Sequence, residues 1–107
     1  MNKNSKIIDG KRYSTDTATK VASWQNSYGY SDFHHMEEDL YITPKGAWFL
    51  VGEGGALSKY AQSCGNNSTC GGVEWTALSV DEAFEWLQQH HKTEELETYF
   101  ADRIQDA

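Results

Sequence analysis

The segment Thr43-Pro44-Lys45-Gly46 constrains the fold of this chain more than any other. Proline presets the backbone angle that the second position of a tight turn needs, and glycine accepts the angle that closes the turn. Residues 33–43 show a strand-like pattern, and the apolar run over residues 47–51 has the length of a second strand. The pattern predicts an antiparallel hairpin over residues 33–51.

This hairpin would pair large side chains across its two strands. With the Pro44-Lys45 dipeptide at the tip, Tyr41 would face Trp48 and Leu40 would face Phe49. Aromatic pairs across strands contribute roughly 0.2–1 kcal/mol each. We therefore expect the hairpin to form the centre of a sheet.

Other segments predict strands and a loop around this hairpin. The Asp9-Gly10 dipeptide lies between β-forming residues, which predicts a hairpin over residues 6–13, because glycine tolerates positive φ. Residues 73–78 alternate between polar and apolar and predict another strand. Residues 64–72 are rich in Gly, Asn and Ser and are expected to form a polar loop.

A short helix is expected near the N-terminus. The Ser14-Thr15-Asp16 segment consists of good N-cap residues. After it, Ala18, Val21 and Ala22 recur at helical spacing, so the helix would end near Trp24.

Two further helices are expected at the C-terminus. Ser79 and Glu82 have the spacing of a capping box, which begins a helix. A second helix begins at Thr93, and residues 90–92 would join the two as a helical hairpin.

Together these elements predict an α+β fold: a small antiparallel sheet with the hairpin 33–51 at its centre, packed with a short N-terminal helix and a C-terminal helical hairpin. The length suits a single domain over residues 1–107.

The charge of the chain is unevenly distributed along the sequence. The net charge is −7 at pH 7. Residues 1–73 carry seven acidic and seven basic side chains, whereas residues 74–107 carry nine acidic and two basic ones. Nucleic acids and anionic membranes need local positive charge, so we expect neither as a direct partner.

The predicted C-terminal helices therefore form the candidate functional surface. Many carboxylates with few bases create a negative potential that can steer a protein toward a basic groove, including one that normally holds nucleic acid. Exposed aromatic side chains such as Trp86, Tyr28 or Tyr30 could anchor the contact, because aromatics dominate binding hot spots. The candidate partner-binding residues are Asp81, Glu82, Glu85, Trp86, Glu94, Glu95, Glu97 and Asp102.

No motif in the sequence defines an active site, so we expect a non-enzymatic chain without cofactor or metal. The alternative is a metal-dependent or thiol enzyme that uses His34, His35, Cys64 and Cys70. Zinc sites usually pair cysteines two to four residues apart with a matching second pair, which this sequence lacks. The two cysteines are expected as free thiols, although a disulfide between them stays possible. A structural or regulatory homodimer is a third reading, so monomer and homodimer both stay open.

Four stretches carry a resemblance to a known group of proteins. They read KIIDGKRY (residues 6–13), DTATKVASW (16–24), EDLYITPKGAWFLVGEGG (38–55) and SKYA (58–61). They resemble small acidic, mostly uncharacterised proteins of bacteria and their phages and plasmids. The resemblance implies a protein of a mobile element, similar to the inhibitors of host defence called anti-CRISPRs. With no secretory or membrane-spanning pattern in the sequence, a cytoplasmic location is expected.

Overall fold

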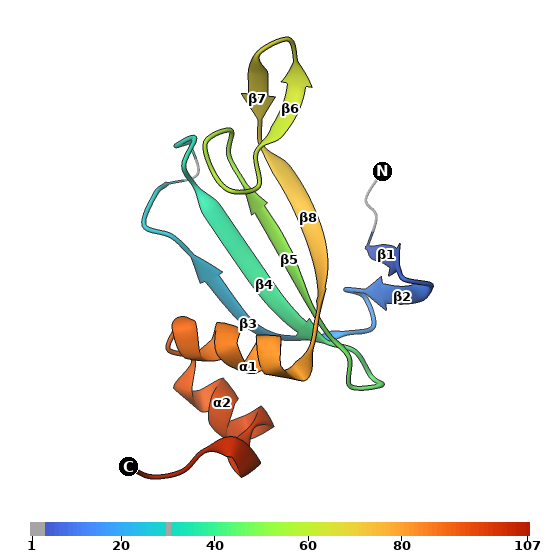
Figure 1. Cartoon of the computed structure of the whole chain (residues 1–107), viewed down its shortest axis with the longest axis vertical. Coiled ribbons are helices and arrows are strands. Elements are labelled where there is room, and N and C mark those ends of the chain that lie inside the picture. The colour runs from blue at the N-terminus through green and yellow to red at the C-terminus, as the bar shows by residue number, and fades with distance from the viewer. Residues whose placement is uncertain (1–3, 30) are drawn as a thin grey trace.

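The computed structural model describes residues 4–29 and 31–107. A four-stranded antiparallel sheet forms its centre, in the order β3-β4-β5-β8 (Figure 1). The strands are β3 (Thr19–Gln25), β4 (Met36–Ile42), β5 (Trp48–Gly54) and β8 (Gly72–Leu78). The predicted hairpin 33–51 corresponds to the two central strands, β4 and β5.

Two short hairpins accompany this sheet. Strands β1 (Ser5–Ile8) and β2 (Lys11–Ser14) pair around a turn in which Asp9 and Gly10 both have positive φ. Strands β6 (Gln62–Gly65) and β7 (Ser68–Cys70) form a hairpin that extends from the end of the molecule away from the helices (Figure 1).

The helices lie at the C-terminal end of the chain, and α1 packs across one end of one face of the sheet (Figure 1). Helix α1 (Val80–Gln89) begins with the predicted capping box between Ser79 and Glu82. Helix α2 (Thr93–Tyr99) begins at the predicted residue, and a 3₁₀ turn, η1 (Ala101–Arg103), follows it. The buried core between helices and sheet consists of Ala22, Leu40, Trp48, Leu50, Ala83, Trp86, Leu87 and Phe100.

The predicted N-terminal helix is wrong, and the fold contains more sheet than expected. Residues 19–25 form strand β3, and eight strands accompany two α-helices in the described part of the chain. The physical reason is a bulge in β3, where the pairing with β4 shifts between Lys20 and Ala22. A bulge adds one residue and breaks the alternation of a strand. The apolar residues therefore recur at three- and four-residue steps that resemble a helix.

The predicted register of the central hairpin is wrong by one residue. Tyr41 pairs with Phe49, and Leu40 pairs with Leu50. The loop contains three residues, 44–46, because Thr43 and Ala47 close it through the hydrogen bond from Thr43 N to Ala47 O at 2.8 Å. Gly46 has φ +87°, the left-handed conformation that such a loop needs at its last position.

The polar loop predicted over residues 64–72 is also wrong in part, because most of it belongs to the β6–β7 hairpin and the start of β8. Its turn uses Asn67 at φ 57°. This hairpin buries almost none of its side chains, so it has no apolar alternation that sequence reasoning could detect.

Among the helices that the structure describes, none is long and apolar enough to span a bilayer.

Candidate functional site

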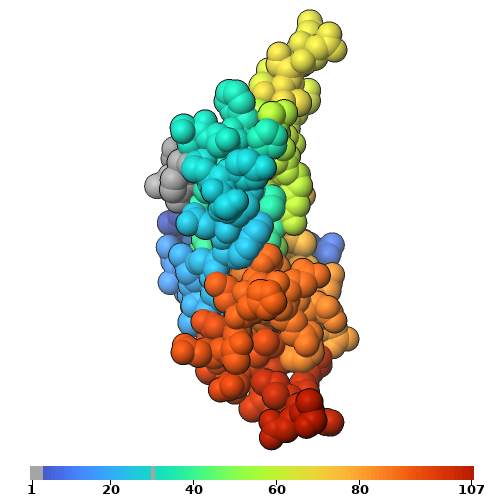
Figure 2. Space-filling view, turned by 90° about the vertical axis from the view of Figure 1, so that its left-hand side faces the viewer, coloured from blue at the N-terminus to red at the C-terminus, as the bar shows by residue number. Residues whose placement is uncertain are grey.

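The candidate carboxylates gather at one end of the molecule, which we call the acidic helical end (residues 79–106). Figure 2 shows this end as a contiguous lobe in orange and red. It holds eight acidic and two basic side chains. The apolar stripe of α1 packs on the sheet, so the acidic residues of that helix face outward. The exposed candidates are Asp81, Glu82, Glu85, Glu94, Glu97 and Asp102, while Glu95 is half-buried.

Two of these carboxylates already have structural roles. Asp81 accepts a hydrogen bond from Arg103 Nη1 at 2.7 Å, which ties η1 to the start of α1. Glu82 accepts from the backbone N–H of Ser79 in the capping box. Within the described chain, no ion pair involves Glu85 of α1 or the candidate carboxylates of α2, and no lysine of the sheet reaches them. Their charge is therefore available to a partner.

Trp86 is not an exposed anchor, contrary to the prediction. Only 7% of its surface is exposed, because it lies on the core-facing side of α1. Its indole N–H donates a hydrogen bond to Glu38 Oε1 at 2.8 Å. Tyr28 is exposed as expected, at 48%, whereas Tyr30 lies outside the described residues.

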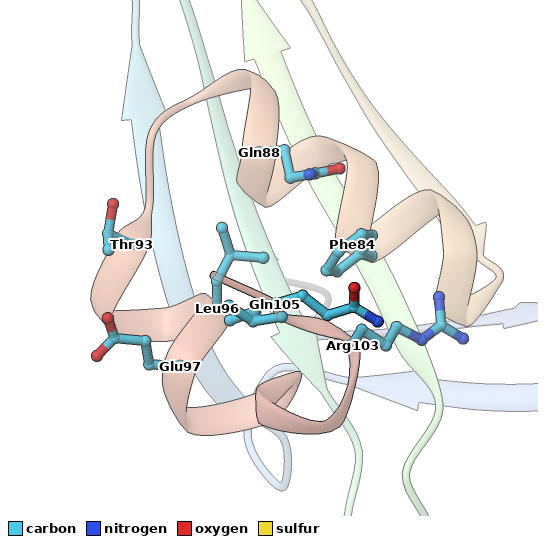
Figure 3. A pocket seen from close by; sticks show the side chains of 8 residues that line it. Phe84, Gln88, Thr93, Leu96, Glu97, Arg103 and Gln105 are labelled. Carbon is cyan, nitrogen blue, oxygen red and sulfur yellow. The ribbon is translucent and has the colours of Figure 1, made fainter. Parts of the chain in front are cut away.

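A hollow lies between the two helices and the C-terminal segment (Figure 3). Its volume is about 460 Å³. The side chains of Phe84 and Leu96 supply an apolar part, with Glu97 and Arg103 beside it. The acidic helical end thus offers an apolar contact as well as charge.

Glu38 holds this end of the molecule against the sheet. Its carboxylate is 3% exposed and accepts hydrogen bonds from the Tyr60 hydroxyl and from the Trp86 indole N–H. Lys59 Nζ lies 2.8 Å from Glu38 Oε2 and closes the site toward solvent. The group therefore joins β4, the β5–β6 connection and α1. We call these four residues the Glu38 anchor.

The charge state of Glu38 follows from these contacts. Burial raises the pKa of its carboxyl, but the hydrogen bonds from Lys59, Tyr60 and Trp86 outweigh burial and lower it. His90 lies beside this carboxylate, with its ring 4.5 Å from that of Trp24, and burial lowers the pKa of its imidazole. The anchor is thus an ionised carboxylate with its donors in place, which suits a structural role.

Gly52 explains how Tyr60 reaches Glu38. A Cβ atom at Gly52 would overlap the ring of Tyr60, which packs against strand β5 at this position. Gly52 lies inside β5, where the absence of a side chain makes room for the Tyr60 ring.

The residues of the enzymatic alternative do not form a common centre. His34 and His35 precede β4, where His34 stacks on Tyr28 at 5.2 Å and His35 Nδ1 lies 2.9 Å from the Tyr28 carbonyl oxygen. Cys64 and Cys70 are free thiols on the β6–β7 hairpin. In the described ranges, no group of three or more His, Cys, Asp or Glu side chains is arranged to hold a metal ion.

A second acidic group, which sequence reasoning missed, lies on the sheet face opposite the helices. Glu37 on β4 pairs directly with Glu53 on β5, and Asp39 is the next residue on that face of β4. A hydrogen bond with Glu37, together with partial desolvation and repulsion from Glu37 and Asp39, raises the pKa of Glu53 to about 7. His35 Nε2, 3.5 Å from Glu37 Oε2, partly offsets this repulsion. Only the strand register reveals this group, because Glu37 and Glu53 are far apart in sequence.

The raised pKa of Glu53 predicts a pH-dependent stability. The folded protein holds the proton up to about pH 7, whereas the unfolded chain releases it near the ordinary value of 4.5. The stability that this group contributes is therefore fully present below pH 4.5 and is lost as the pH rises toward 7. The substitution Glu53→Gln should abolish this loss of stability with rising pH. Because Glu53 is exposed, solvent screens the effect, so we expect a small change. The difference in Tm between the variant and the parent should be about 2 °C larger, in favour of the variant, at pH 8 than at pH 4.5.

Thermal unfolding of both proteins at the two pH values measures this difference. Glu74→Gln, an exposed glutamate on β8, serves as the control and should show no such change with pH. An equal Tm difference at both pH values would refute a shared proton between Glu37 and Glu53.

Comparison of the chain with known proteins adds no relative to this description. No profile of a known protein family matches, and searches of curated proteins and of solved structures give no significant match.

Proposed function

We propose that this chain is a non-enzymatic protein-binding module whose acidic helical end binds a basic surface of a partner protein. One observation carries the proposal: the end formed by α1 and α2 (Figure 2) exposes Glu85, Glu94 and Glu97, for which the described part of the chain shows no ion pair. Only Lys92 and Arg103 oppose them there, and Arg103 is engaged with Asp81. Such a surface speeds association with a positive partner and disfavours a negative one.

The partner that fits best is a basic groove that otherwise holds nucleic acid. A dense row of carboxylates can occupy such a groove in place of phosphates and so block it. The resemblance to small proteins of phages and plasmids supports a complex of host defence as the owner of that groove. The proposed action is then inhibition by occupation, as in anti-CRISPR proteins, with no bond made or broken.

The hollow between the helices would add specificity to this electrostatic contact. Phe84 and Leu96 offer an apolar surface of the size that a single partner side chain can fill. Glu97 at its edge favours a long basic side chain, whose stem is apolar and whose head is charged. Contacts of this kind at the centre of an interface supply most of the binding energy.

Charge reversal at the acidic helical end tests the proposal. Affinity capture from a bacterial lysate at low salt, compared with high salt, identifies the partner, because screening weakens the contact. The double variant Glu85→Lys with Glu97→Lys changes two exposed mid-helix positions and should retain the fold. We expect its Kd for that partner to rise by roughly 100-fold, about 1.4 kcal/mol for each reversal.

A variant with the same change in net charge elsewhere is the control. Asp16→Lys with Glu74→Lys alters two exposed residues outside the acidic helical end. It should change the Kd much less. If the two double variants weaken binding equally, the helical end is not the binding surface, and only the net charge matters.

A further inference from the structure

The sheet face opposite the helices presents two rows of side chains that the core does not use. The strand register places Gln25, Glu37, Glu53 and Val73 in one row across β3, β4, β5 and β8. The next row consists of Ser23, Asp39, Val51 and Trp75. We call these eight residues the open sheet face.

The boundary of this face is set by the N-terminal hairpin. The third row contains Tyr41 and Phe49, and Tyr13 of β2 covers it with its ring 5.4 Å from that of Phe49. Phe49 is fully buried there. In the two rows beyond, every side chain is exposed or half-buried, and Val73 is 53% exposed. A strand face of this kind is large enough for a second secondary-structure element.

The open sheet face has an acidic side and an apolar side. Glu37 and Asp39 lie on β4, and Glu53 lies directly opposite Glu37 on β5. Val51, Val73 and Trp75 occupy the adjacent positions on β5 and β8. Lys20 Nζ lies 3.7 Å from Asp39 Oδ2, and His35 Nε2 lies 3.5 Å from Glu37 Oε2. Like charges placed directly opposite on neighbouring strands destabilise a sheet, so cations near Glu37 and Glu53 would relieve this repulsion.

We propose that the open sheet face binds a basic amphipathic helix of a protein partner. Neighbouring strands lie about 4.8 Å apart and a helix is about 10 Å wide, so a helix along the strands would span both sides of the face. Its apolar stripe would cover Val51, Val73 and Trp75, while its lysines or arginines would meet Glu37, Asp39 and Glu53. A second copy of this face would oppose carboxylates to carboxylates, which disfavours self-association here. The proposal concerns a different surface from the acidic helical end and does not depend on it.

Peptide titration of the full chain, followed by two-dimensional NMR, tests this inference. The probe is a synthetic peptide of leucine and lysine with its leucines at helical spacing. A peptide of the same composition in scrambled order has the same charge but no apolar stripe. We expect the ordered peptide to shift the amides of residues 37–39, 51–53 and 73–75 and the indole N–H of Trp75. Because the peptide is basic, it should also shift amides of the acidic helical end, as a separate site. The scrambled peptide should shift these signals by less than about a third as much, because it cannot bury an apolar stripe.

Paired variants separate the two surfaces. Glu37→Lys with Glu53→Lys should raise the Kd of the ordered peptide at the open sheet face by at least roughly tenfold, while the shifts over residues 79–106 stay unchanged. Glu85→Lys with Glu97→Lys should reduce the shifts over residues 79–106 and leave the Kd at the open sheet face unchanged. Val73→Ser, a change at an exposed position, gives an independent reduction if the double variant misfolds.

Three results would overturn the inference. The signals of the open sheet face could stay fixed in the titration. Both peptides could shift them equally, which would reduce the contact to non-specific charge. Finally, the affinity of the ordered peptide for this face could be the same in the parent, in Val73→Ser and in the double variant Glu37→Lys with Glu53→Lys.

Discussion

The substitution Glu38→Ala should lower the free energy of unfolding by about 3 kcal/mol. It would leave the Tyr60 hydroxyl and the Trp86 indole N–H without their acceptor. Each buried donor without a partner costs about 1–3 kcal/mol. Lys59 is 61% exposed, so its lost ion pair with Glu38 adds little. Because small domains have about 5–15 kcal/mol in total, this single change would consume a large share of the stability.

Urea unfolding followed by tryptophan fluorescence measures this loss, and two variants calibrate it. Glu38→Gln keeps an acceptor oxygen for one donor and should lose about half as much. Glu74→Ala removes a glutamate from the same row of the sheet, on β8, but at an exposed position, and should stay within about 0.5 kcal/mol of the parent. If Glu38→Ala and Glu74→Ala unfold at the same urea concentration, the Glu38 anchor does not hold the helices to the sheet.

The substitution Phe49→Ala should cost about 3–5 kcal/mol, the largest effect expected from any single truncation on the sheet face opposite the helices. The Phe49 side chain is fully buried although it points away from the helices. Tyr41 and Trp75 stack against its ring at 5.0 and 5.6 Å, and Tyr13 meets it edge-on. Aromatic pairs of this kind contribute about 0.5–1.5 kcal/mol each beyond the burial of area.

The same substitution at an exposed phenylalanine is the matched control. Phe33 is 65% exposed, so Phe33→Ala should change the free energy of unfolding by about 0.5 kcal/mol or less. Loss of Phe49 should also release the β1–β2 hairpin, which limited proteolysis would detect as cleavage within residues 5–14. Equal urea midpoints for the two variants would mean that the aromatic group around Phe49 contributes little to the fold.

The sequence predicted those elements whose signal is local. The capping box at Ser79, the helix start at Thr93 and the Asp9-Gly10 turn each depend on a few adjacent residues, and the structure contains all three. The central hairpin was also predictable, because Pro44 and Gly46 define its turn. Its register was not, because the choice between a two- and a three-residue loop depends on the Thr43–Ala47 pair.

The remaining features depend on distant residues. The bulge near Lys20 hides a strand behind a helix-like spacing, and no local residue marks it. Glu38 has the same surroundings in sequence as its acidic neighbours Glu37 and Asp39, yet it alone is buried, because it shares a face with Leu40. Its partners Tyr60 and Trp86 come from other elements, so only the tertiary structure shows that Trp86 is a buried donor.

The candidate site shows the same limit. The acidic character of the last third of the chain was evident from charge counts, and the structure gathers those carboxylates at one end. The open sheet face was not evident, because its residues come from four strands and meet only through the register.

The β6–β7 hairpin provides an attachment site for a dye that can measure ligand binding in tests of both proposals. Cys64 is exposed there, at the end of the molecule away from α1 and α2 (Figure 1). With Cys70 replaced by serine, a maleimide dye would react at one thiol and leave the carboxylates of the helices untouched. Fluorescence anisotropy of that dye then gives a binding isotherm for any candidate ligand at nanomolar protein, without a tag fused to either terminus.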